Sequence, residues 1–119
     1  MRALVKKEDE IIGDRIKVAH NFGQRLQGLL GKKTLKKGEG LLLIPCRQVH
    51  TFLMSFYLDV LFLNKQGEIV ALVAEMAPGC KSPLVQESYQ VLELPVGTIA
   101  LKNLKKGDCL EIIKVKEKV

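Results

Sequence analysis

The alternation of apolar and polar positions predicts short β-strands over most of the chain. Near its start we expect strands at residues 3–5, 10–12 and 15–19. A turn is expected at Gly13-Asp14, because glycine followed by aspartate between apolar runs is a common turn signal. These pieces predict one or two antiparallel pairings at the start of the chain.

From residue 41 onward the pattern becomes more strongly β-like. The apolar run 58–64 and the run 68–76 flank a tight turn in which Gly67 can take a positive φ, so they predict a β-hairpin. An extended segment at 49–54 and strands at 89–95 and 109–119 are also expected. The last carries lysines on one face, which is typical of an exposed edge strand.

One segment has helical periodicity. Its apolar stripe recurs at i, i+4, i+7 and i+8 and consists of Phe22, Leu26, Leu29 and Leu30. Asn21 is a good N-cap, Gln24 completes a capping box, and Gly31 stands where a helix-ending glycine belongs. The pattern predicts a short helix over 22–30, with Arg25 at the rim of the stripe and able to reach inward.

These elements predict a mainly β protein, all-β or α+β, built as a small antiparallel barrel or sandwich with one short helix near residues 22–30. At 119 residues the chain is expected to form a single domain, 1–119. Its 47% hydrophobic and 27% charged residues are ordinary for a globular protein.

Charge and the N-terminal sequence narrow the classes of partner. The net charge of +6 favours anionic partners only non-specifically, and the lack of Trp gives little surface for base stacking, so no specific nucleic acid is expected. The opening MRALVKKEDE has no signal-peptide core, and no run approaches the roughly 18 apolar residues of a membrane span. We expect a cytoplasmic protein without membrane insertion.

The stretch CRQVHTFLMSFYLDVLFL, residues 46–63, carries the most suggestive chemistry. Cys46, His50 and Met54 are evenly spaced and could ligate a soft metal. On an extended chain, however, four residues span about 13 Å, against about 6 Å in a helix. Extended geometry is favoured here, so the spacing opposes both a three-ligand site and a Cys46–His50 nucleophile pair within the segment. With Cys80 and Cys109, Cys46 is expected to be a free thiol.

Two carboxylates lie among apolar neighbours. Asp59 is flanked by the run LDVLFL and Glu93 lies between two leucines, and neither is easily buried without a partner. Arg25 is the candidate partner of Asp59, and such a pair would lock the helix onto the sheet. Two carboxylates in one cleft would suggest general acid–base catalysis.

An ordered set of motifs carries a resemblance to a known family. The motifs are R-x-x-G-L at 25–29, G-x-G-L-L-L at 38–43, C-x-x-V-H-T-F-x-M at 46–54, L-D-V-L-F-L at 58–63, G-E-I-V at 67–70 and V-L-E-L at 91–94. Over about residues 18–112 the chain resembles the bacterial and archaeal domain of unknown function 192 family. The resemblance implies a compact β-rich domain and supplies no activity.

The leading hypothesis is a non-enzymatic accessory domain that binds a small molecule or a protein and needs no cofactor. Its expected cleft is bordered by Arg25, His50, Met54, Asp59 and Glu93. One alternative is a thiol or acid–base enzyme that uses Cys46 or His50 with Asp59 or Glu93. Another is a soft-metal site formed by His50 and Met54 with a cysteine.

Overall fold

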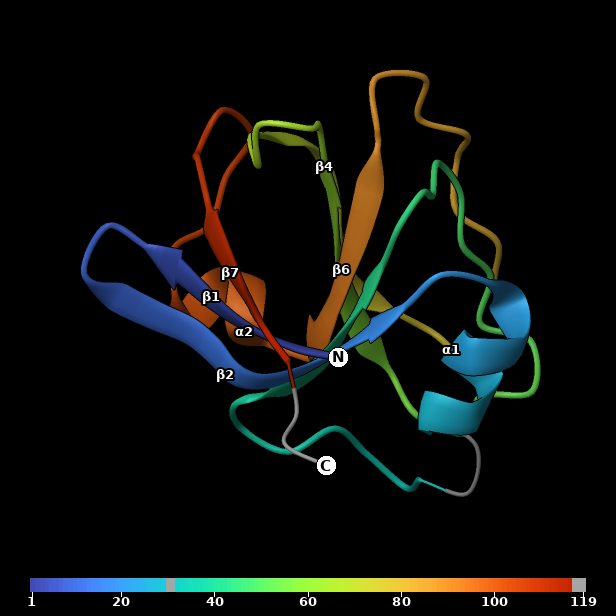
Figure 1. The fold of residues 1–119 in the computed structure, drawn as a ribbon. Helices are drawn as coiled ribbons and strands as arrows, with labels where there is room; N and C mark the ends of the chain where they lie inside the picture. Colours follow the sequence, from blue (N-terminus) through green and yellow to red (C-terminus); the bar gives the residue numbers. More distant parts are fainter. Residues whose placement is uncertain (30–31, 117–119) are drawn as a thin grey trace.

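A seven-stranded sheet and two short helices make up the computed structural model, which describes residues 1–29 and 32–116 (Figure 1). The mainly β class is thereby confirmed. The elements are β1 (Arg2–Lys7), β2 (Glu10–Ala19), α1 (Phe22–Leu29), β3 (Glu39–Leu43), β4 (Leu58–Leu63), β5 (Ile69–Met76), β6 (Gln90–Pro95), α2 (Thr98–Leu101) and β7 (Glu111–Val115). Neither helix is long and apolar enough to cross a bilayer in the part of the chain described.

The sheet curls on itself without closing. Its strand order is β5-β4-β6-β3-β2-β1-β7, so β5 and β7 are the two ends. Glu68 and Cys109, which precede these strands, form an isolated antiparallel bridge, and the N–H of Leu110 donates to the carbonyl of Gly67 at 2.8 Å. A Cβ on Gly67 would lie 2.3 Å from the Leu110 carbonyl oxygen, so this meeting point requires glycine.

One pair of strands corrects the expectation of an antiparallel sheet. β2 and β3 run parallel, with Arg15 opposite Glu39 and Ala19 opposite Leu43. Parallel neighbours need a crossover connection, and α1 with the loop after it supplies this connection. The expected helix at 22–30 is confirmed over Phe22–Leu29, whereas Leu30 and Gly31 lie outside the described residues.

The first turn also lies elsewhere than expected. Gly13 and Asp14 are inside the ten-residue strand β2, and the chain turns at Glu8-Asp9 instead. The space where Gly13 would carry a Cβ is occupied by the side chain of Ile16, at 2.5 Å. This glycine therefore serves close packing inside a strand rather than a turn.

Residues 46–57 do not form the extended strand that their alternation predicts. Their backbone groups pair irregularly with the loop before β6: Thr51 N–H donates to the Cys80 carbonyl at 2.8 Å, and Ser82 N–H donates to the Val49 carbonyl at 2.8 Å. His50 and Lys81 form only an isolated bridge. By contrast, the β4–β5 hairpin is confirmed, with antiparallel pairing and Gly67 at φ 86°.

Both faces of the central strands are buried, and each face has its own core. The first core contains Leu61, Leu92 and Leu94 and includes Ile99 of α2. The second core, on the other face, contains Leu58, Val60 and Val91 and includes Leu29 of α1. Burial on both faces explains why β4 and β6 are apolar almost throughout.

Candidate functional site

The candidate site lies where α1 begins. The Asn21 side chain accepts a hydrogen bond from the N–H of Gln24 at 2.9 Å, and the Gln24 side chain accepts one from the N–H of His20 at 2.7 Å. This is the reciprocal capping predicted from the sequence, displaced by one residue at the N-terminal side. It fixes the direction in which the first turn of α1 approaches the chain after β3.

The buried face of α1 is rotated from the predicted stripe. Phe22 is 49% exposed, whereas Arg25 is only 3% exposed and Leu29 is buried beneath the helix. Arg25 therefore points into the protein rather than lying at the rim, and its side chain replaces the expected apolar contact of Phe22.

Glu93 is the partner of Arg25. Arg25 Nε donates to Glu93 Oε1 at 2.8 Å and Nη2 donates to Oε2 at 2.6 Å, and the Glu93 carboxylate is fully buried. Two parallel charge-assisted hydrogen bonds of this kind are the strongest geometry available to an arginine and a carboxylate. The pair joins α1 to β6 at the centre of the sheet.

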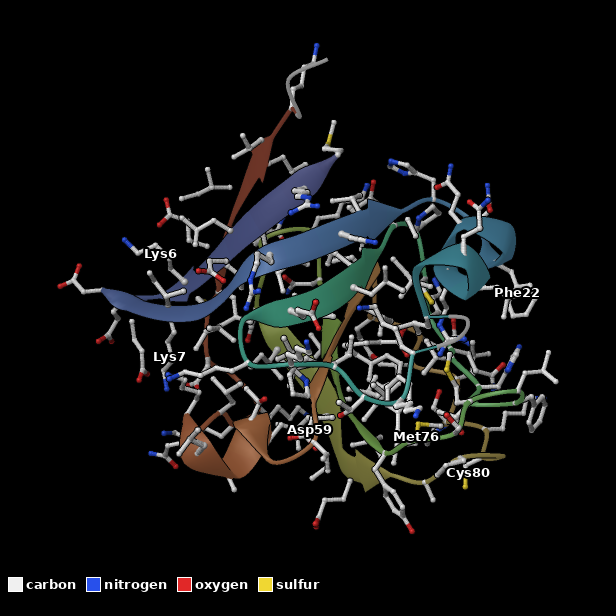
Figure 2. All side chains as sticks on the ribbon, turned by 90° about the horizontal axis from the view of Figure 1, so that it is seen from below. Lys6, Lys7, Phe22, Asp59, Met76 and Cys80 are labelled. Atoms are coloured by element: carbon white, nitrogen blue, oxygen red, sulfur yellow. The ribbon has the colours of Figure 1, made fainter. Side chains whose placement is uncertain are left out.

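The predicted pairing of Arg25 with Asp59 is wrong. Along β4, Asp59 alternates with Leu58 and Val60 of the second core, so its side chain projects to the face opposite α1. There its carboxylate accepts hydrogen bonds from the N–H groups of Glu75 at 2.9 Å and Ile99 at 2.8 Å. Figure 2 shows Asp59 beside α2, away from Phe22 on α1.

Asp59 thus stabilises backbone rather than bordering a cleft. Glu75 has a positive φ of 54°, at a register shift between β4 and β5, and its amide has no strand partner opposite Asp59. Ile99 lies in the first turn of α2, whose early amides lack intrahelical acceptors. One carboxylate satisfies both groups, which explains why an acid is buried there.

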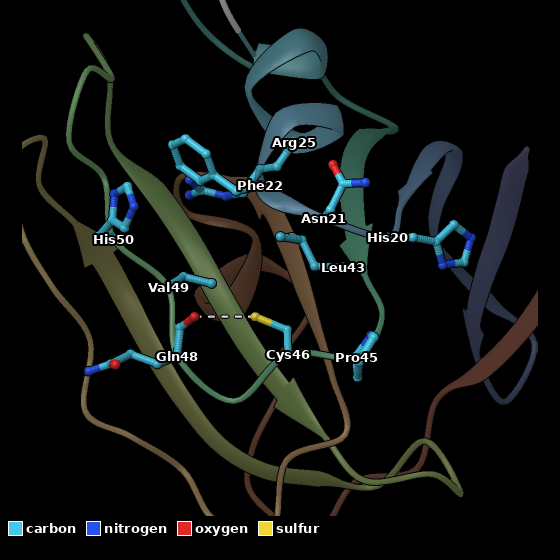
Figure 3. Close-up of a pocket in the computed structure, with 10 residues that line it drawn as sticks. All are labelled: His20, Asn21, Phe22, Arg25, Leu43, Pro45, Cys46, Gln48, Val49 and His50. Carbon is cyan, nitrogen blue, oxygen red and sulfur yellow. Dashed lines mark hydrogen bonds between the residues drawn. The ribbon is translucent and has the colours of Figure 1, made fainter.

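A pocket of about 140 Å³ opens between α1 and the segment that follows β3 (Figure 3). Arg25, Cys46 and His50, three of the residues expected at the site, line it together. Met54 does not line it, Asp59 is on the other face, and Glu93 lies behind Arg25. The full lining consists of His20, Asn21, Phe22, Arg25, Leu43, Pro45, Cys46, Gln48, Val49 and His50.

His50 is held between two aromatic rings. Its imidazole stacks on Phe52 with the centroids 4.6 Å apart and lies tilted against Phe22 at 5.2 Å. Nδ1 is the one enclosed side-chain nitrogen or oxygen without a hydrogen-bond partner among the described residues. Burial, and then the positive charge of Arg25, lower the pKa of His50 below its ordinary value, so the ring is neutral near pH 7.

The Cys46 thiol does not hydrogen-bond to a basic side chain among the described residues. Its Sγ donates to the carbonyl oxygen of Gln48 at 3.2 Å rather than to His50. Burial is the largest influence on the pKa of Cys46 and raises it above its ordinary value. Near neutral pH Cys46 is therefore a protonated thiol within the pocket wall.

The expected metal ligands do not converge. Met54 packs against the second core, and residues 1–29 and 32–116 contain no group of three or more His, Cys, Asp or Glu side chains placed to hold a metal ion. Cys46 and His50 share the pocket, but the third expected ligand does not join them there.

The family comparison agrees with the motifs on which the resemblance rested. The family DUF192, described as Uncharacterized ACR, matches residues 3–112. The chain belongs to the DUF192 family. The match begins nearer the N-terminus than the motifs do, and it covers β1 from its second residue and the first two residues of β7.

Two solved structures share the fold of this DUF192 chain. A protein of unknown function from Novosphingobium aromaticivorans has a TM-score of 0.77 at 21% identity, with 92% of this chain and 82% of that chain covered. A protein from Sinorhizobium meliloti described as a putative transcription regulator has a TM-score of 0.70 at 25% identity, with 82% of this chain and 80% of that chain covered. Comparison with curated proteins gives no match.

Sequence reasoning missed part of this DUF192 pocket. The helical stripe predicts a buried Phe22, but its position directly after the N-cap Asn21 leaves it at the open end of the helix. No sequence pattern marks His20 or Gln48 as a site residue. Both line the pocket because β2 and β3 pair in parallel, which brings the ends of the two strands to one edge of the sheet.

Proposed function

We propose that this DUF192 chain is a non-enzymatic binding domain that holds a small ligand in the pocket between α1 and the segment after β3. The observation that carries the proposal is unused hydrogen-bonding capacity at two neighbouring polar groups. Neither ring nitrogen of His50 hydrogen-bonds to a described residue. Among the same residues, Arg25 bonds only to Glu93, through Nε and Nη2. Polar groups in protein interiors are nearly always paired, so two pocket-lining side chains with unused hydrogen-bonding groups point to an absent partner.

The size and lining of the pocket limit the ligand. An enclosed apolar cavity of roughly 150 Å³ can take up a benzene molecule, and drug-sized ligands need roughly 300 Å³ or more. With about 140 Å³, this pocket suits a single ring or a short aliphatic group. Phe22, Leu43 and Val49 supply apolar contact, while Arg25 and His50 supply orientation.

The state of Cys46 favours binding over thiol catalysis. A nucleophilic cysteine needs a neighbouring base or a lowered pKa. Cys46 instead donates to a backbone carbonyl and burial raises its pKa. Glu93 is engaged by Arg25 and Asp59 by two backbone amides, so neither carboxylate supports the acid–base alternative.

Two-dimensional ¹H–¹⁵N NMR of the full chain with toluene as probe tests the proposal. Toluene should cause saturable shifts confined to the amides of residues 20–25 and 46–50. Cys46→Leu, which fills the pocket, should abolish these shifts. The same substitution at exposed Cys109 is the matched control and should leave them unchanged. Absent, scattered or non-saturating shifts would refute a binding pocket at this place.

A further inference from the structure

We infer that the ligand of this pocket offers an uncharged acceptor oxygen, of the carbonyl or carboxamide type, to Arg25, and that a carboxylate is disfavoured. The inference rests on the proposed function and specifies its ligand class. Three features support it: the free donors of Arg25, the donor state of His50 and the charge balance set by Glu93.

Arg25 retains donors toward the pocket. A guanidinium has five N–H donors, and the two bonds to Glu93 use one on Nε and one on Nη2. Nη1 makes no hydrogen bond to any described residue. Since Arg25 lines the pocket, these donors are presented to its contents.

His50 adds a second donor. An enclosed N–H without an acceptor is costly, so the neutral ring places its proton on Nε2 and leaves Nδ1 bare. Arg25 exerts its charge on His50, which places the two groups in mutual range, and Figure 3 shows both at the same end of the pocket. Two donors facing one small space call for a ligand that accepts hydrogen bonds.

Glu93 decides the charge of that ligand. It is fully buried and contacts Arg25 through both oxygens, so the guanidinium charge is already neutralised within the protein. A carboxylate that entered would lose its hydration without gaining an uncompensated positive charge in return. A carbonyl oxygen pays a smaller desolvation cost and still accepts from Nη1. The pair therefore selects a neutral acceptor.

Three probes that share a phenyl ring, of which benzamide and benzoate are nearly equal in shape, test the inference by NMR titration of the full chain. Benzamide supplies a neutral carbonyl, benzoate supplies an anion, and toluene supplies neither. Benzamide should bind about tenfold or more tightly than toluene, as expected for one hydrogen bond from a charged donor. Benzoate should bind less tightly than benzamide.

Two variants separate recognition from folding. In Glu93→Gln the Arg25 charge is uncompensated, so the preference should reverse toward benzoate. If that variant is too unstable to titrate, benzoate should raise its Tm while benzamide does so less. In the double variant Arg25→Met/Glu93→Met, toluene binding should persist while the benzamide advantage disappears.

The outcomes distinguish this inference from the proposal beneath it. Equal binding of benzamide and toluene to the unmodified chain, or tightest binding of benzoate, overturns the inference and leaves the pocket as a binding site. An unchanged preference in Glu93→Gln overturns the role of Glu93. Failure of all three probes to shift the pocket amides overturns the proposed function itself.

Discussion

Arg25 and Glu93, 68 positions apart in the chain, form a two-point ion pair in the interior, with N–O distances of 2.8 and 2.6 Å. The pair attaches α1 to the central strand β6, and Arg25 lines the pocket. A buried ion pair adds little net stability over apolar residues of similar volume, but loss of one partner is costly. Loss of one partner should therefore lower the free energy of unfolding more than replacement of both partners by apolar residues.

Substitution of one partner should be far more harmful than substitution of both. We expect Arg25→Met and Glu93→Met each to lower the free energy of unfolding by about 3–5 kcal/mol, because each leaves an uncompensated buried charge. The double variant should recover most of this loss. Urea unfolding followed by circular dichroism measures all three.

The exposed Arg15–Asp14 pair is the control for this cycle. Its side chains are 51% and 59% exposed, and the same cycle should show little coupling there. Additive losses for Arg25→Met and Glu93→Met would contradict direct coupling between them.

Asp59→Asn should destabilise the protein without altering the pocket. The amide keeps one acceptor oxygen but turns an NH₂ group toward either Glu75 or Ile99, at a cost of about 1–3 kcal/mol. Hydrogen exchange at these two backbone amides should accelerate. Asp14→Asn, at an exposed position, serves as control and should change the unfolding free energy little. If Asp59→Asn changed the affinity for toluene as much as Cys46→Leu does, the pocket and Asp59 would not lie on independent faces of the sheet.

The Cys46 thiol should react slowly. With Cys80 and Cys109 replaced by serine, alkylation by iodoacetamide at pH 8 should be slower than that of free N-acetylcysteine, because burial shields Cys46 and raises its pKa. The variant that retains only exposed Cys109 is the matched comparison. Alkylation of Cys46 at or above the rate of N-acetylcysteine would restore the case for an activated nucleophile.

His50 should make the folded state less stable in mild acid. Its pKa in the folded protein lies below the ordinary value of 6.5, so below about pH 6.5 the unfolded chain binds more protons than the folded one. Stability present above pH 6.5 is therefore lost as the pH falls toward the lowered pKa. His50→Phe removes this titration. The free energy of unfolding of the variant minus that of the unmodified chain should therefore be more positive at pH 5 than at pH 8.

His20→Phe is the control for His50→Phe, because it also removes one histidine from the chain. Urea unfolding at both pH values provides the measurement. An equal difference between His50→Phe and the unmodified chain at pH 5 and pH 8 would contradict the lowered pKa.

Local patterns predicted the elements whose interactions are themselves local. The Asn21 and Gln24 cap, the β4–β5 hairpin with Gly67 and the edge strand β7 are set by neighbouring residues, and all three are found in the structure. Local pattern failed at residues 46–57. There the backbone groups pair with the distant loop 77–89, and alternation alone cannot distinguish such irregular pairing from a strand.

The sequence by itself determined the mainly β class, the helix at the start of the pocket, the family motifs, and the fact that Arg25, Asp59 and Glu93 each needed a partner. Only the tertiary structure decided which partners they received. That choice depends on which face of its strand each carboxylate occupies, and the curl of the sheet together with the parallel β2–β3 pair sets which face α1 covers. Glu93 lies on that face and Asp59 does not, because side chains along a strand alternate and register is settled by contacts far apart in the chain.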